Sequence, residues 1–172
     1  MTDTLAIIPQ EVRALIESTR PGAEALVEQR RGTEEWAKLD AADVAIAQMP
    51  QHDFTVRHVY TPGLCVREIF MPAGAILTSR IHLFEHPFVI SLGVCSVWSD
   101  EHGWEVLRAP HTGITRPGTR RALYIHEDTI WSTFHVTTET DPKKMLAAIT
   151  YDHLKLGHLS SIPADQTKKE LS

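Results

Sequence analysis

The chain has 172 residues, a net charge of −5 and 42% hydrophobic residues. This length suits one domain with an ordinary core. Acidic residues outnumber basic ones, which is not the composition typical of a nucleic-acid-binding protein. No apolar run approaches the roughly 20 residues that span a bilayer. The N-terminal residues lack the pattern of a secretory signal. We therefore expect a cytoplasmic protein that binds neither nucleic acid nor a membrane.

The first part of the chain, residues 1–50, is expected to form a helical arm. Apolar residues spaced for one helix face precede Pro21–Gly22, which is expected to break that helix. A second short helix should end at Gly32, and Thr33 should cap a third helix that ends before Pro50. Two roles remain open for this arm. It either covers a sheet edge or joins a dimer contact, or it packs on its own domain.

The central part, residues 51–140, consists of short runs of β-branched and aromatic residues separated by turns that contain glycine or proline. Such a pattern predicts an antiparallel β-barrel or sandwich. Residues 141–172 should add a short C-terminal helix, capped by Asp141, and a polar tail. Cys65 and Cys95 lie in apolar runs and are expected to be buried free thiols. The expected strands cover residues 64–71, 75–82, 86–92, 94–98, 104–107, 122–125 and 129–136.

Four histidines are candidate metal ligands. His82 and His86 are four residues apart, so their imidazoles would share one face of either a strand or a helix. Neutral imidazole is a common ligand of divalent metals. His126 and His135 are equal further candidates, although strict alternation along a strand would point His126 away from Arg121. The alternative for the histidine pair is a polar role without a metal.

The stretch from about Arg67 to His135 resembles the cupin family of small antiparallel β-barrels of the jelly-roll type. The first cupin motif has two glycines that frame two histidines and a glutamate, and the interval from Gly74 to Gly93 has this spacing. His82 occupies one ligand position of the motif. Arg80 stands where the family has its other histidine, and His86 stands where it has the carboxylate. The segment is also similar to small cupin-like proteins of phage and prophage genomes, whose activity is undefined.

The second cupin motif is matched less closely. The turn at Pro117–Gly118 fits it with one residue missing, and Arg121 replaces its histidine. By resemblance, both motifs meet at the mouth of the barrel. The arginines Arg80, Arg116, Arg120 and Arg121 would then lie together there, and the replacement of ligands by Arg80 and Arg121 favours binding of an anion such as a carboxylate or phosphate. Salt bridges to neighbouring carboxylates are the alternative. Glu85 is expected to orient one of the paired histidines.

Two classes of function follow from this resemblance. The first is an enzyme that uses one divalent metal ion (Zn, Fe, Ni or Mn) to act on a small anionic metabolite. The second is a metal-free module that binds or sequesters such an anion without turnover. A structural role in a larger assembly stays open because the helical arm has no other assigned task. The resemblance and the arm together predict a homodimer.

Overall fold

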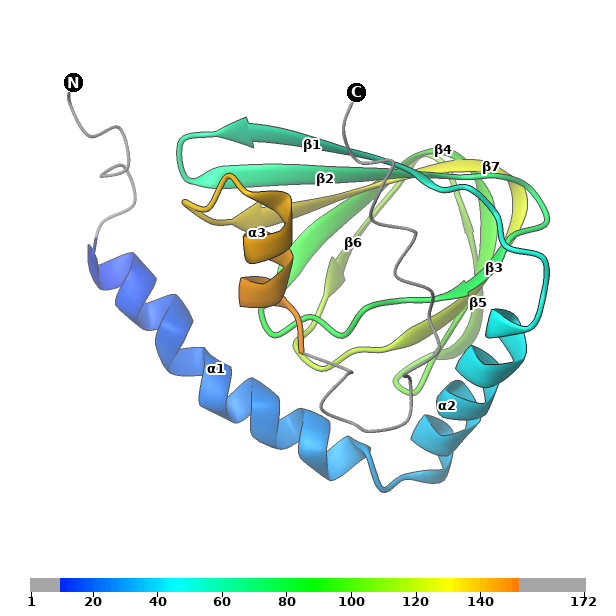
Figure 1. Cartoon of the computed structure of the whole chain (residues 1–172), viewed down its shortest axis with the longest axis horizontal. Helices are drawn as coiled ribbons and strands as arrows, with labels where there is room; N and C mark the ends of the chain where they lie inside the picture. Colours follow the sequence, from blue (N-terminus) through cyan, green and yellow to red (C-terminus); the bar gives the residue numbers. More distant parts are fainter. Residues whose placement is uncertain (1–9, 152–172) are drawn as a thin grey trace.

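The computed structural model describes residues 10–151, without the side chains of residues 11–13. A curled sheet of strands forms the body of the molecule, with helices at both ends of the chain (Figure 1). The helices are α1 (Gln10–Arg30), α2 (Glu34–Ala47) and α3 (Pro142–Ile149). The strands are β1 (Thr55–Thr61), β2 (Leu64–Met71), β3 (Ile76–Thr78), β4 (His86–Ser99), β5 (Gly103–Arg108), β6 (His111–Thr115) and β7 (Arg121–Val136).

Two long strands, β4 and β7, pair antiparallel along their length and form the spine of the sheet. The second half of β7 also pairs with β2, and its first half pairs with β3. On the other side, β4 pairs with β6 through its first half and with β5 through its second half. All of these pairs are antiparallel. The fold is therefore mainly β, with N-terminal helices and a short C-terminal helix, as the sequence predicted.

A bend at Gly93 lets the two long strands change direction together. Gly93 has a φ of +91°, and a Cβ built there would lie 2.3 Å from the Asp128 carbonyl oxygen. Only glycine fits such a close approach at a positive φ. The register between β4 and β7 shifts around this point. Each of these strands was predicted as two shorter strands, whereas both run through this point without interruption.

One end of the barrel interior is filled by an apolar core. Inward side chains of β4 and β7 dominate it, and the rings of Phe88 and Trp131 stack with centroids 4.4 Å apart. Gly113 makes room for Phe88, because a Cβ at Gly113 would lie 2.5 Å from the ring. The buried members are Met71, Ala75, Phe88, Ile90, Cys95, Val97, Leu123, Ile125 and Trp131.

Helix α1 corrects one expectation. It runs without interruption through Pro21, where a break was predicted. Proline removes one N–H donor, so the Glu17 carbonyl loses its helical partner. The turns on either side of Pro21 continue the helix, and the two short helices expected here are therefore one.

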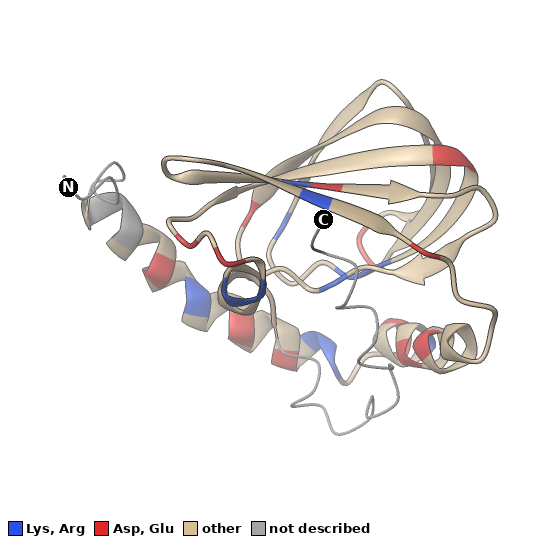
Figure 2. Cartoon of the chain, turned by 45° about the horizontal axis from the view of Figure 1, so that its top comes forward, with Lys and Arg blue, Asp and Glu red and all other residues tan. Residues whose placement is uncertain are grey.

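Helix α2 begins as expected, because the Thr33 hydroxyl accepts a hydrogen bond from the Trp36 N–H at 3.3 Å. It packs against β3 and β7. The buried Arg120 guanidinium donates to Asp40 Oδ1 at 2.6 Å and also pairs with Asp43. Figure 2 shows the acidic positions on α2 that make this pairing possible. The helix is thus a cap on its own domain.

Several smaller expectations can be compared with the structure. Cys65 and Cys95 are buried and free, as predicted. The strand expected over residues 75–82 is much shorter, and β6 was not anticipated. The polar tail lies outside the described residues. Within the described part of the chain, no helix is both long and apolar enough to cross a membrane.

Candidate functional site

Three histidines meet inside the barrel at the end opposite the apolar core. His86 is the first residue of β4, and His135 lies near the end of β7. His82 is not on a strand continuous with His86. It lies in an irregular segment held by hydrogen bonds on both sides, from Gly118 N to the His82 carbonyl at 2.8 Å and from Tyr151 N to the Ile81 carbonyl at 2.9 Å. The pair therefore meets through long-range contacts and not through local alternation.

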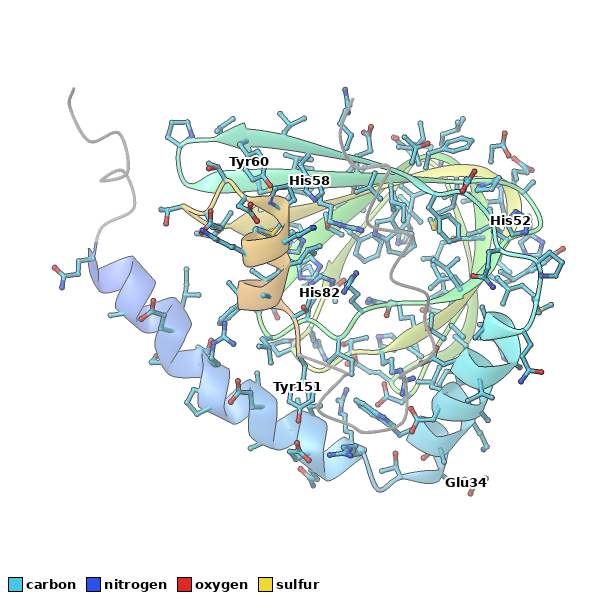
Figure 3. All side chains as sticks on the ribbon, viewed as in Figure 1. Glu34, His52, His58, Tyr60, His82 and Tyr151 are labelled. Carbon is cyan, nitrogen blue, oxygen red and sulfur yellow. The ribbon has the colours of Figure 1, made fainter. Side chains whose placement is uncertain are left out.

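The three imidazoles are close enough to share one ion. One ligand nitrogen from each of His82, His86 and His135 lies within 4.8 Å of the others. The centroid of the His86 ring lies 4.4 Å from the centroid of His82 and 4.4 Å from that of His135. The His82 and His135 rings stack with their centroids 5.2 Å apart. Figure 3 shows His82 on the side of the barrel that faces α3, where Leu83 N donates to the Ile149 carbonyl at 2.8 Å.

Hydrogen bonds orient two of the three rings. His86 Nδ1 lies 3.1 Å from the Phe84 carbonyl oxygen, so Nδ1 carries the proton and Nε2 keeps its lone pair. His135 Nε2 lies 2.9 Å from the Thr133 hydroxyl. That hydroxyl donates to the Arg67 carbonyl at 3.3 Å, which leaves it to accept from His135 Nε2. Each ring therefore keeps one nitrogen available as a ligand.

Burial keeps these imidazoles neutral. Desolvation lowers the pKa of His82 well below its usual range, and the neighbouring His86 and His135 add to this effect. Desolvation also lowers the pKa of His86. For His135, desolvation followed by the effect of His86 lowers the pKa to about 3. Neutral imidazole is the form that binds a metal.

Two arginines flank the histidine cluster. Arg121, at the start of β7, shares the inward face with Leu123 and donates from Nη1 to the Thr115 hydroxyl at 3.2 Å. Its guanidinium lies 5.7 Å from the centre of the Phe88 ring. Its charge contributes to the low pKa of both His82 and His86. Arg67, on β2, contributes in the same way to His82 and His135.

The register of three strands explains the position of Arg67. His58 of β1 pairs with Arg67 of β2, which pairs with Thr133 of β7. The sequence analysis did not propose Arg67 as a site residue. A signal was present, because Arg67 alternates onto the same strand face as Cys65 and Met71, both of which are buried. A charged residue on an apolar face is a candidate for function.

Other predicted site residues lie away from the cluster. His126 is exposed on β7, and its Nε2 lies 2.7 Å from the Ser96 hydroxyl. Arg80 and Glu85 are also exposed, and the acceptor that orients His86 is the Phe84 carbonyl, so Glu85 is not needed for it. Arg116 is exposed and pairs with Glu101. The structure thus brings together His82, His86, His135 and Arg121. It does not bring His126, Arg80, Glu85 or Arg116 to the cluster.

The residues present fit a metal ion. His82 Nδ1 is buried and has no hydrogen-bond partner among the described residues. An unpaired buried nitrogen is costly, and a bound ion would satisfy it. Carbonyl and hydroxyl acceptors behind His86 and His135 are the usual supports of ligating imidazoles. Within residues 10–151 these three histidines form the one group of this kind that could hold an ion.

Comparisons with known proteins do not show a family for this chain. No family model and no curated protein match the sequence. Among solved structures, the chain is similar to KdgF from Halomonas sp., at 14% identity, with 58% of this chain and 91% of that one covered and a TM-score of 0.45.

Other similar structures include named cupins. One is a cupin superfamily protein from Desulfitobacterium hafniense, at 6% identity, with 52% and 82% of the two chains covered and a TM-score of 0.43. Another is the Cnp3 cupin domain from Schizosaccharomyces pombe, at 16% identity, with 58% and 71% covered and a TM-score of 0.43. At these values, function must be inferred from the residues of this chain alone.

Proposed function

We propose that this chain is a cupin-like, metal-dependent protein that binds a small anionic molecule inside its barrel. His82, His86 and His135 would hold one divalent ion. The observation that carries the proposal is the convergence of three imidazole nitrogens within 4.8 Å, two from His82 and His86, which are close in sequence, and one from His135, which lies far along the chain. Burying this cluster without an ion is costly, because His82 Nδ1 loses its hydration without gaining a partner among the described residues.

Each residue of the site has a distinct task in this proposal. The Phe84 carbonyl and the Thr133 hydroxyl fix the orientation of the rings of His86 and His135. Thr115 holds the Arg121 guanidinium, which is the group suited to a carboxylate or phosphate oxygen. A bound divalent ion would supply Lewis acidity, polarising an oxygen of the anion or of a water molecule. Four imidazole-compatible metals, Zn, Fe, Ni and Mn, remain candidates.

Elemental analysis tests the metal site. The protein is purified without a histidine tag and without added metal, and its bound metal per chain is measured. We expect His82→Ala, His86→Ala and His135→Ala each to lower occupancy about tenfold or more, since even supporting residues cost tenfold to a hundredfold. His126→Ala is the matched control, because it removes an exposed histidine of the same strand as His135. Equal loss in the control would contradict the proposal.

A metal-free anion-binding module is the second candidate. It is favoured by Arg67 and Arg121, whose charges lie near the histidines and oppose a bare cation. If this candidate is correct, the purified protein contains no metal, and reconstitution with a divalent ion fails. Binding of a carboxylate to the metal-free protein would then weaken in Arg121→Ala and stay unchanged in Arg80→Ala, because Arg80 is exposed.

A further inference from the structure

The charges around the histidine cluster do not balance when a metal is bound. The three imidazoles are neutral ligands, so a divalent ion keeps its full charge of about two. Arg121 adds a permanent positive charge beside the cluster, because its Nη1 donates to the hydroxyl of Thr115, which is the cross-strand partner of His86. All of these charges lie in a partly buried region, where electrostatic interactions are stronger than in water.

No carboxylate of the described residues joins the histidines as a ligand. The carboxyl groups that act most strongly on Arg121 are Glu101, Glu105 and Asp100. Two of these already face other arginines. Glu101 pairs with Arg116, and Asp100 lies 3.4 Å from Arg30. The negative charge that would balance the metal must therefore come from outside the described chain.

We propose that the metal and a carboxylate ligand bind cooperatively, with the carboxylate bridging the metal and the Arg121 guanidinium. This inference rests on the proposed metal site and adds the class of ligand and its coupling to the metal. Without the anion, Arg121 repels the metal. With the anion in place, both positive groups face a shared negative charge. A ligand with two carboxylates balances more of the excess charge than a monocarboxylate and is expected to couple more strongly.

The position of Arg121 supports a bridging role. Its Nη1 is held by the Thr115 hydroxyl, and its planar group lies near the Phe88 ring. These contacts fix the guanidinium on the inward face of β7 but use only part of its five donors. Within the described chain, Arg121 forms no ion pair, in contrast to the buried Arg120, whose two Nη atoms pair with Asp40 and Asp43. The two neighbouring arginines therefore differ in role: Arg120 pairs with carboxylates of α2, and Arg121 faces the histidines.

Titration of the metal-free full chain with Co²⁺ tests the coupling. The dissociation constant is measured in sodium chloride, sodium acetate and disodium succinate at equal ionic strength, with correction for Co²⁺ complexes in solution. We expect succinate to tighten Co²⁺ binding about tenfold or more relative to chloride, and acetate to tighten it less. Thermodynamic reciprocity requires Co²⁺ to tighten succinate binding by the same factor. The visible spectrum of bound Co²⁺ should also change when succinate enters its coordination sphere.

Three variants sharpen the test. Arg121→Met removes the charge but keeps an unbranched side chain against Phe88. It should tighten Co²⁺ binding in chloride and reduce the effect of succinate to less than about twofold. Arg121→Lys keeps the charge but loses the paired donors, and should retain part of the coupling. Arg108→Met, on the exposed strand β5, makes the same chemical change away from the site and should behave like the wild type.

The outcomes separate the two proposals. Equal Co²⁺ affinity in chloride and succinate overturns the cooperative binding but leaves the metal site intact. Failure to bind Co²⁺ in every solution overturns both proposals. If the methionine variant does not fold, the lysine variant decides, because full wild-type coupling in that variant would overturn the bridging role of Arg121.

Discussion

The two ends of the barrel interior are built from the same strands but have opposite chemistry. Along β7, Trp131 packs in the apolar core, while His135 joins the histidine cluster on the same inward face. Along β4, Phe88 belongs to the core, and His86 belongs to the cluster. One end gains stability from buried apolar surface. The other end buries imidazoles and guanidiniums, which cost free energy unless they are paired.

The helices follow this division only in part. Helix α2 packs on β3 and the start of β7, where Arg120 pairs with it, but its Trp36 also packs with Ile81 beside His82. Helix α3 covers the histidine end, because its Met145 and Ile149 pack with Cys65. The comparison indicates that stability and function are separated along single strands. Substitutions at the two ends should therefore have different consequences.

The largest expected effect on stability is at the apolar end. Trp131→Ala removes a buried ring stacked on Phe88 and should lower the free energy of unfolding by about 3–5 kcal/mol. Urea unfolding at neutral pH measures this change. Trp104→Ala is the control, because that ring is 66% exposed and should cost less than about 0.5 kcal/mol. Similar losses in the two variants would mean that the apolar core is not where stability resides.

A smaller effect should come from acidifying the metal-free protein. The pKa of His135 is lowered to about 3 in the folded state, against an ordinary value of about 6.5 in the unfolded chain. Between these values the unfolded chain binds more protons, so stability is present above about pH 6.5 and is lost as the pH falls below it. The contribution of His135 alone should lower the free energy of unfolding by about 2 kcal/mol when the pH falls from about 7 to about 5.

Urea unfolding at several pH values checks this prediction. His135→Ala should reduce the dependence of the free energy of unfolding on pH between pH 7 and pH 5, and the lowered pKa values of His82 and His86 should leave part of it. If the free energy of unfolding changes with pH equally in the wild type and in His135→Ala, the protonation of His135 does not destabilise the protein.

The smallest of these effects concerns the start of α2. Thr33→Ala removes the hydroxyl that accepts from the Trp36 N–H and should cost about 1 kcal/mol. The Thr33 hydroxyl does not contact the histidine cluster, although Trp36 of α2 packs with Ile81 beside His82, so the same variant should bind a metal as the wild type does. Thr33→Ser keeps the hydroxyl and serves as the control. A change in metal occupancy in Thr33→Ala would show that the two ends are coupled.

Much of the fold could be predicted from local sequence patterns. Alternating residues and turn-forming glycines gave β2, the Thr33 cap and the helix after Asp141, because each depends on near neighbours. The continuity of β4 and β7 could not be predicted. It depends on the close approach of Gly93 to Asp128 across the sheet, and this contact is not visible in either segment alone.

The site was predictable in part for the same reason. His82 and His86 were identified by their spacing, although the contacts that hold His82 are long-range. His135 could not be separated from His126 once β7 was divided in two. On the continuous strand, alternation from Arg121 points His135 inward and His126 outward, as found. Arg67 was missed because no motif of the family contains it.

The hydrogen bond between Tyr151 N and the Ile81 carbonyl also has a consequence for the order of folding. It joins the His82 segment to residues that follow α3, near the end of the described chain. During synthesis, the ribosome releases His82 and His86 well before these residues. The histidine cluster therefore stays incomplete until β7 and the residues after α3 have been synthesised, and an ion captured earlier would meet fewer ligands than the finished protein offers.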